Sequence, residues 1–460
     1  MGSRSVSGNS GLFGDLPEQL VPEAPGRGMP RLRQPERHQL GWHALMIDDL
    51  VADDHPVRAV WAFVQSLDLR ALHEAVKARE GVPGQAPPAP ELMMALWLCA
   101  TVEGVGSARQ LARLCEQHLA YRWLCGGVSM NYHTLSDFRV AHSELLDRLL
   151  AGGVAALVRE GLVALDVLAQ DGLRVRAAAG AASFRRRERL VELAAAATAR
   201  VARLRAELEA DPAAGDRRQR AAQQRAARER AARVKPAPGR EQGAALERMS
   251  ELEAERAWRE KTNKAEVSRQ KEPRASTTDA EARSMKLADG GFRPAYNMQI
   301  VSAPKGQVVV AVDIDTTGSD RGLARPMLER LDAAGMSPSD YLVDGGFTKN
   351  DDIEWAHENG IKLWCPPVHS KHGSDPYAPR RDDRPGVADW RRRMASEPGK
   401  ALYKQRGQAE CPNAWARRMG LTRLCVRGKD KARAVLLWFA LAHNMLRAFA
   451  LRRAAIAAAS

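Results

Sequence analysis

The segment 185–275 constrains the fold most, because its composition cannot form a hydrophobic core. It is rich in Ala, Arg, Glu and Gln, is almost free of aromatic residues, and carries 24 Lys and Arg against 15 Asp and Glu. A charged stretch of this kind is typical of long exposed helices. The breaks at Asp211-Pro212 and Pro236–Gly239 predict a helical hairpin or coiled coil, with Leu190, Leu193, Val201 and Leu204 as its apolar seam. Because strand patterns occur on both sides, we expect a sheet whose strands this insertion separates in sequence.

The strand patterns predict a mixed sheet. Before the insertion, residues 165–176 alternate in polarity around Gln170-Asp171-Gly172, which indicates a β-hairpin. After it, strands are expected at 295–301, 308–314, 341–343 and 361–365, with helices at 320–334, 351–359, 400–418 and 430–455. Residues 366–399 are rich in Pro and charge and are expected to be irregular. This order favours an α/β or α+β domain.

The part before residue 160 has a different pattern. Residues 1–40 are rich in Gly, Pro and Arg without a period, and we expect a flexible basic arm. Helical spacing then predicts helices from Pro56 onward and at 91–103, 108–118, 134–142 and 145–160. The expected organisation is a helical domain at 41–160, a sheet domain at 161–184 and 276–455, and the insertion at 185–275.

Composition limits the class of protein. The 460-residue chain is 45% hydrophobic, which excludes global disorder, and its net charge of +14 with a pI near 9.8 favours a polyanionic partner such as nucleic acid. The six cysteines form no C-x-x-C pair and are expected to be free thiols in a reducing cytoplasm. The longest apolar run, 434–446, contains His443 and Asn444 and is too short to span a bilayer. The expected location is the cytoplasm, near the nucleoid.

Two acidic residues are candidates for a catalytic site. Asp171 and Asp344 each follow an apolar strand pattern, at the ends where open sheets place their sites. Each also precedes glycine, which lets a ligand approach the backbone closely. The alternative is that each Asp-Gly pair is only a turn, and for either residue alone this alternative is favoured.

A third motif is more specific. Tyr403, Arg406, Glu410 and Arg417 have spacings of three, four and seven, which predicts one face of a helix. The alternative is a solvated charged face. Pro412 predicts a kink or break close to Glu410. Together with Asp171 and Asp344, Glu410 would complete a set of carboxylates suited to two Mg²⁺ or Mn²⁺ ions for phosphoryl transfer, with Arg406 on a phosphate.

These motifs together resemble the DDE-type insertion-sequence transposases, close to insertion-sequence family 1182 and related to the insertion-sequence 4 and 5 groups. The motifs that carry the resemblance are AQDG at 169–172, DGGFRPAYNMQ at 289–299, LVDGGF at 342–347, the Tyr403/Arg406/Glu410/Arg417 signature, EGVGSAR at 103–109 and YHTLSDFR at 132–139. They span about residues 50–450. The family signature ends in Lys, which Arg417 replaces here.

The resemblance implies a ribonuclease H-like catalytic core. Asp171, Asp344 and Glu410 would bind two Mg²⁺ or Mn²⁺ ions, and Tyr403, Arg406 and Arg417 would contact the DNA end. The implied reaction is hydrolysis at element ends followed by attack of the freed 3′-hydroxyl on target DNA. The implied partners are double-stranded DNA, comprising terminal inverted repeats and target DNA, and a second copy in a synaptic homodimer, without a membrane.

The helical domain is expected to read DNA. A turn before a helix beginning near Thr134 resembles a helix-turn-helix, which would present Thr134, Ser136 and Arg139 to the major groove. The alternative is an ordinary helical bundle with a polar surface. The fold class expected overall is α+β and multidomain: an all-helical DNA-binding domain, a ribonuclease H-like mixed-sheet catalytic domain, and a long coiled-coil-like insertion.

Three other functions stay open from the sequence. One is a nuclease of the same fold that cleaves without rejoining DNA. Another is an inactive DNA-binding repressor derived from such an element. The third is a coiled-coil scaffold built on residues 185–275.

Overall fold

The computed structural model describes residues 46–78, 85–210, 244–262, 272–367 and 375–459, together with the single helical positions 223, 226 and 227. Contacts divide the chain into a unit 1–45 and a unit 46–460, and all described residues belong to the second unit. The basic arm expected at residues 1–40 lies outside the described residues, as do the breaks expected at Asp211-Pro212 and Pro236–Gly239.

Helices come first along the described chain, as predicted. They are η1 (Ile47–Leu50), α1 (Pro56–Gln65), α2 (Arg70–Ala75), α3 (Pro90–Val102), α4 (Ala108–Gln117), α5 (Leu119–Cys125), α6 (Tyr132–Ala141) and α7 (Ser143–Arg159). Side chains start two of them: Ser107 accepts from the Gln110 amide at α4, and Asn131 accepts from the His133 amide at α6. The short helix α5 was not predicted, because its seven residues are too few for a clear period.

A six-stranded mixed sheet follows. Its strands are β1 (Val167–Arg176), β4 (Arg283–Lys286), β5 (Phe292–Ala303), β6 (Val308–Asp315), β7 (Asp340–Leu342) and β8 (Lys362–Trp364). The strand β5 pairs antiparallel with β1, β4 and β6, whereas β1, β7 and β8 run parallel. The expected mixed sheet is therefore present, and its strands come from both sides of the insertion.

The hairpin predicted around Asp171 is wrong. The strand β1 is continuous through Gln170-Asp171-Gly172 and pairs with β5 along its length from Ala169 to Arg176. Asp171 therefore lies within a strand rather than at its end. Long-range pairing with β5, which the local sequence does not encode, stabilises the extended backbone where the Asp-Gly pair suggested a turn.

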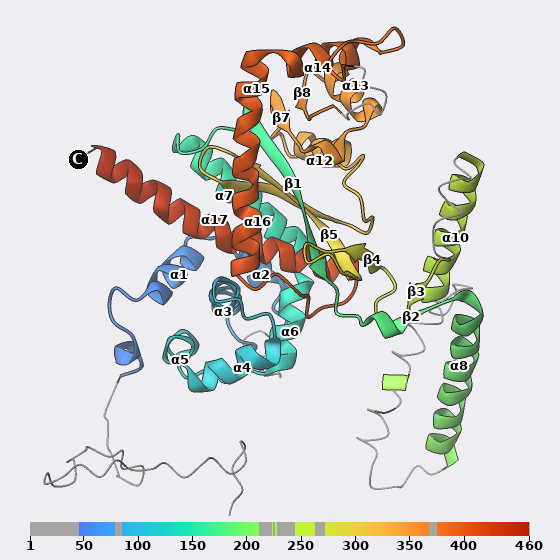
Figure 1. Cartoon of the computed structure of the whole chain (residues 1–460). Coiled ribbons are helices and arrows are strands. Elements are labelled where there is room, and N and C mark those ends of the chain that lie inside the picture. Colours follow the sequence, from blue (N-terminus) through green and yellow to red (C-terminus); the bar gives the residue numbers. More distant parts are fainter. Residues whose placement is uncertain are drawn as a thin grey trace, which may run out of the picture. The chain divides into compact units, whose positions relative to one another are not determined.

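The C-terminal part contains more helix than predicted. Its helices are α12 (Ala324–Ala333), η3 (Gly345–Phe347), α13 (Asn350–Glu358), α14 (Pro385–Ala395), α15 (Glu397–Tyr403), η4 (Lys404–Ala409), α16 (Glu410–Arg418) and α17 (Lys429–Ala459). The expected irregular region 366–399 holds α14 and the start of α15, because Pro385 and Pro398 occupy first-turn positions that need no amide hydrogen. The single helix expected at 400–418 is divided by the 3₁₀ segment η4. Figure 1 shows α15 and α16 following one another alongside β1.

The N-terminal helices and the sheet share one hydrophobic core. Trp97 of α3, Tyr296 and Met298 of β5, and Trp438 of α17 belong to a single cluster of buried side chains. A second cluster lies around β7 and includes Tyr341. Burial of each large apolar side chain contributes roughly 1.5–3 kcal/mol, so this shared core strongly couples the helices to the sheet.

Helix α17 is the central element of that core. It is long and apolar enough to cross a membrane, but 72% of its most apolar window is buried inside the fold. The Asn444 amide exchanges two hydrogen bonds with Val309 of β6, at 2.8 and 2.7 Å, and the His443 ring bonds to the Gln307 carbonyl at 2.7 Å. His443 and Asn444 are therefore satisfied polar groups of a core helix.

The insertion is tied to the sheet domain by a short ladder, β2 (Phe184–Arg185) with β3 (Ala275–Ser276). Its described helices are α8 (Arg187–Ala210) and α10 (Ala244–Thr262). They meet through Leu190, which packs with Ala245 and Met249, and through an ion pair of Arg187 with Glu253. Of the expected seam, Leu190 is buried, Leu193 and Val201 are partly buried, and the Leu204 side chain lies outside the described residues.

Candidate active site

Asp171 is held near the centre of the sheet by donors from two elements. The Gly172 amide donates to its Oδ1 at 2.9 Å, and the Asn413 side chain of α16 donates to its Oδ2 at 2.8 Å. Burial raises the pKa of the Asp171 carboxyl to about 6, while the charge of Arg406 and the Gly172 hydrogen bond act in the opposite direction. This carboxyl is therefore held in a fixed position, and its burial disfavours the charged form.

Asp344 lies just beyond the end of β7. It is the N-cap of η3, where its Oδ1 accepts the Gly346 amide at 2.7 Å. A Cβ on Gly346 would stand 2.9 Å from that oxygen. The second glycine therefore leaves room for the Asp344 side chain to cap the turn that follows it. The remaining oxygen, Oδ2, faces Arg406 at 3.7 Å.

Glu410 is the first residue of α16, and its side chain is 66% exposed. Pro412 lies in the first turn of the same helix, where a missing amide hydrogen costs nothing. The helix begins two residues before this proline, after the 3₁₀ segment η4, so the predicted break is confirmed.

One guanidinium joins all three acids. Arg406 Nη2 lies 3.3 Å from Asp171 Oδ1 and 3.7 Å from Asp344 Oδ2, and its Nη1 lies 3.2 Å from Glu410 Oε1. The acids come from β1, the end of β7 and the start of α16. Tertiary structure thus brings together three carboxylates that are 173 and 66 residues apart in sequence.

The other two members of the signature take different places. The Tyr403 hydroxyl donates to the Val343 carbonyl at 3.1 Å, and burial raises the pKa of Tyr403 to about 12. Tyr403 therefore fastens α15 to the end of β7, beside Asp344. Arg417 is exposed at the far end of α16 and, among the described residues, forms no ion pair with the three acids. The prediction that all four signature residues share one helical face is wrong, because α15, η4 and α16 divide them.

Sequence analysis did not select the polar residues that support the site. Asn413 is 5% exposed and bonds to Asp171, although it lies only three residues after Glu410. On β5, Asn297 and Gln299 donate to Asp320 Oδ1 at 2.7 and 3.0 Å. The position of Asn413, one helical turn after Glu410, was a signal that could have identified it.

Comparison with known families gives two matches. Residues 271–445 match the family described as Transposase DDE domain, and residues 45–141 match the family described as Transposase domain (DUF772). Both matched families are transposase families, and each match covers less than half of the chain. No curated protein and no solved structure matches it.

The DDE match covers only part of the acid cluster. It contains Asp344, Arg406 and Glu410, whereas Asp171 precedes it on the other side of the insertion. The pairing of β1 with β5 and β7 is what brings Asp171 to the other two acids.

The second match contains the helix that was predicted to read DNA. Thr134 and Ser136 are exposed on α6, and Ser136 lines a cavity of about 320 Å³ together with Arg109 of α4. Arg139 also lines this cavity, but it is largely buried. It is 7% exposed, its Nη1 donates to the Gly106 carbonyl, and its guanidinium lies 4.6 Å from the Trp97 ring centroid. These contacts point Arg139 toward the core rather than toward the surface that Thr134 and Ser136 share, and its contact with DNA stays a prediction.

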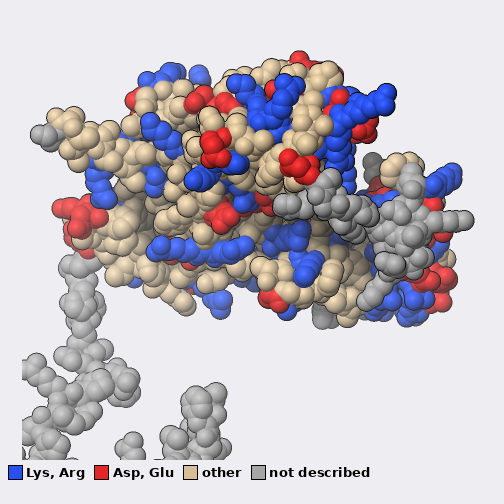
Figure 2. All heavy atoms as spheres, turned by 45° about the horizontal axis from the view of Figure 1, so that its top comes forward, with Lys and Arg blue, Asp and Glu red and all other residues tan. Residues whose placement is uncertain are grey.

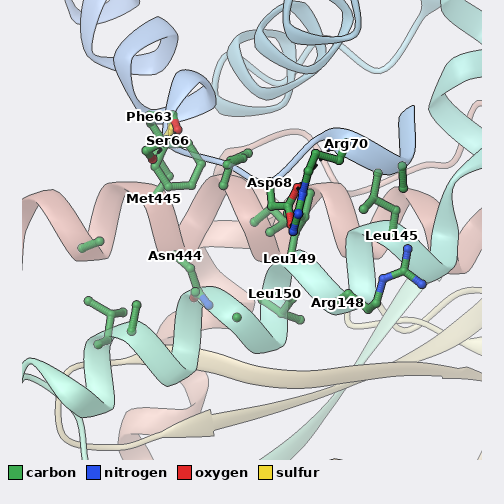
Figure 3. Close-up of a pocket in the computed structure, with 18 of the residues that line it drawn as sticks. Phe63, Ser66, Asp68, Arg70, Leu145, Arg148, Leu149, Leu150, Asn444 and Met445 are labelled. Carbon is green, nitrogen blue, oxygen red and sulfur yellow. Dashed lines mark hydrogen bonds and ion pairs between the residues drawn. The ribbon is translucent and has the colours of Figure 1, made fainter. Parts of the chain in front are cut away.

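A larger cavity lies between other elements of the fold. It has a volume of about 730 Å³ and is walled by α1, α7 and α17, with Phe63, Leu149 and Met445 among its apolar lining. Figure 3 shows the Asp68–Arg70 ion pair beside these side chains. None of the three acids lines this cavity, so it is separate from the candidate active site.

The protein surface carries both signs of charge. Figure 2 shows Lys and Arg side chains interspersed with acidic ones over the visible face, without one uniform basic patch. The net charge of +14 therefore supports attraction to DNA in general rather than marking one groove.

The acid cluster fits a hard divalent cation in its donor chemistry. Three carboxylates face one point, and the Oδ1 atom of Asn413, next to Asp171, is buried without a hydrogen-bond partner. Among the described residues, no group of three His, Cys, Asp or Glu is close enough to hold a metal ion by itself. The Arg406 guanidinium lies between the carboxylates.

Proposed function

We propose that this chain is a transposase that binds the ends of an insertion sequence, cuts them by metal-dependent hydrolysis and joins the freed 3′-hydroxyl to target DNA. The observation that carries the proposal is the convergence of Asp171, Asp344 and Glu410 on the Arg406 guanidinium. An intact acid cluster favours an active enzyme over an inactive repressor. The mixed sheet supports a ribonuclease H-like core, and the motifs support placement near insertion-sequence family 1182.

The three acids would hold two Mg²⁺ or Mn²⁺ ions. Such ions would activate the attacking oxygen and stabilise the leaving oxygen during in-line displacement. The protein's own contribution is orientation. Asn413 and the Gly172 amide hold the Asp171 carboxylate, and the Gly346 amide holds that of Asp344. Arg406 has the planar fork that binds phosphate oxygens in pairs.

DNA recognition is assigned to two surfaces. Thr134 and Ser136 on α6 would contact base edges, with Arg109 of the neighbouring helix on the backbone. Near the acids, Arg406 would bind the scissile phosphate and exposed Arg417 would bind the flanking strand. Tyr403 would act through the position of Asp344, since its hydroxyl is engaged with Val343.

Two features of the proposal concern assembly and location. Joining two element ends requires both ends in one complex, so a homodimer in a synaptic complex is expected. The cytoplasm, close to the nucleoid, is the expected location.

The test uses linear DNA containing the sequences that border the coding region. We expect the wild-type chain with Mg²⁺ or Mn²⁺ to nick at the ends and to join a pre-cut 3′-hydroxyl end to a plasmid. Asp344→Asn should bind the ends with unchanged affinity and reduce cleavage at least about 1,000-fold. Cleavage without joining would favour a nuclease instead. End binding by the wild type without any cleavage would favour a repressor.

A further inference from the structure

We propose that Arg406 acts as a built-in counter-cation for the catalytic acids. It would compete with divalent metal ions for these carboxylates until a DNA phosphate draws its guanidinium away. The inference rests on the proposed function, in which Asp171, Asp344 and Glu410 hold the ions. It assigns to Arg406 a role before DNA binds, in addition to a contact with DNA afterwards.

The contacts of Arg406 carry the first step. Its two terminal nitrogens lie between 3.2 and 3.7 Å from oxygens of all three acids, so the guanidinium occupies the point on which the carboxylates converge. A divalent ion bound by the same oxygens would need that point. The two cations therefore exclude each other on steric and electrostatic grounds.

The guanidinium is also incompletely satisfied where it lies. The Arg406 side chain is 18% exposed, and its Nε is buried without a hydrogen-bond partner. A buried unpaired donor costs free energy, and in a native structure it requires an explanation. Two phosphate oxygens would offer a bidentate partner, which would also pair the Nε–H group of the guanidinium.

The aspartates stay in place when Arg406 leaves. Asp171 keeps its bonds from Gly172 and Asn413, and Asp344 keeps its bond from Gly346. Glu410 differs, because Arg406 is its one partner among the described residues and its side chain is mostly exposed. Release of Arg406 would thus free Glu410 to turn toward an ion beside two fixed carboxylates.

The local backbone permits this exchange. Arg406 lies in η4, a 3₁₀ segment between α15 and α16, and such segments have weaker hydrogen bonds and often mark hinges. Gly407 follows it, with open space where a Cβ would stand. A small rotation of η4 can therefore redirect Arg406 without disturbing the buried side chains of α16.

The closing experiment measures Mn²⁺ binding to the full chain without DNA, from the electron paramagnetic resonance signal of free Mn²⁺. We expect Arg406→Gln to bind Mn²⁺ at least about ten-fold more tightly than the wild type, because a positive charge beside the ion is removed. Arg406→Lys should remain close to wild type. The matched control is Arg417→Gln, which removes the same charge about 16 Å further along the chain of helical segments and should change the affinity less than about two-fold. Asp344→Asn should lose tight binding.

A second measurement adds DNA to the Mn²⁺ titration. A DNA duplex that carries the sequences bordering the coding region should tighten Mn²⁺ binding by the wild type, because its phosphate would draw Arg406 away from the acids. This coupling between DNA binding and Mn²⁺ binding should vanish in Arg406→Gln, which lacks the competing charge. If Arg406→Gln binds Mn²⁺ no more tightly while Asp344→Asn still loses it, the counter-cation role is overturned and the metal site stands. The same holds if DNA leaves wild-type Mn²⁺ affinity unchanged. If Asp344→Asn binds Mn²⁺ like the wild type, the metal site itself is wrong.

Discussion

Asp171 and Asp344 each lie two residues beyond Ala169 and Leu342, the last paired residues of the parallel strands β1 and β7. Equal offsets on neighbouring parallel strands place both carboxylates at the same level of the sheet. The strand β7 ends there, whereas β1 continues to Arg176 along β5. Asp171 therefore combines a position at the end of the parallel pairing with the rigidity of a strand interior.

Asn413 should be a positioning residue for Asp171. In Asn413→Ala the Asp171 carboxylate loses a buried donor, and a hydrogen bond to a charged group contributes roughly 1.5–3 kcal/mol. Single-turnover cleavage of end DNA should slow about 10- to 100-fold with unchanged DNA affinity. Asn413→Asp should be slower still, because it sets a second carboxylate against the first. Equal rates for both variants and the wild type would contradict this role.

Gly172 should tolerate no side chain. A Cβ there would stand 2.5 Å from Asp320 Oδ1 and 3.0 Å from Gln299 Nε2, and the hydrogen bonds of Asp320 restrict its retreat. Gly172→Ala should lower the free energy of unfolding by about 1–3 kcal/mol in chemical denaturation. The control is Gly152→Ala in α7, where a Cβ meets nothing within 4 Å and helix propensity predicts a gain of up to about 1 kcal/mol. The same sign for both variants would sink the steric argument.

Arg139 should matter for stability and not for DNA. Arg139→Ala removes the bond to Gly106 and the contact with Trp97, which should lower the unfolding free energy by about 2–4 kcal/mol. Ser136→Ala, on the exposed side of the same helix, should leave the melting temperature unchanged and weaken end binding measured by fluorescence anisotropy. A stable Arg139→Ala protein with weakened DNA binding would restore the original assignment.

His443 should make stability fall in mild acid. Burial lowers the pKa of His443 to about 4, whereas in the unfolded chain it is about 6.5. Between these values the unfolded chain binds the proton more readily than the folded chain. The contribution of neutral His443 to the unfolding free energy is therefore fully present above pH 6.5 and is lost as pH falls toward 4. The loss amounts to about 3 kcal/mol at most. The difference in unfolding free energy between the wild type and His443→Gln, measured from pH 4 to pH 7, should show this slope. A difference that does not change with pH would rule out the role of His443.

The sequence predicted the elements better than their pairing. Helices with a clear period, such as α3 and α7, and the apolar strand β6 were found close to their observed bounds. The continuous strand through Asp171-Gly172 was missed, because a local Asp-Gly pair favours a turn and only the partner strand β5 overrules it. The helix α14 was missed because its first-turn proline was interpreted as a sign of irregular structure.

The sequence by itself determined the chemistry available to this protein: three acids with metal-binding oxygens, the spaced Tyr, Arg and Glu of the signature, and a charged insertion that cannot enter a core. Tertiary structure decided which of these residues meet. Side-chain direction depends on strand register and on where each helix begins, and both are set by contacts between segments far apart in sequence. For this reason Arg406 lies among the acids, Tyr403 bonds to Val343, Arg139 faces the core, and Asn413 holds Asp171.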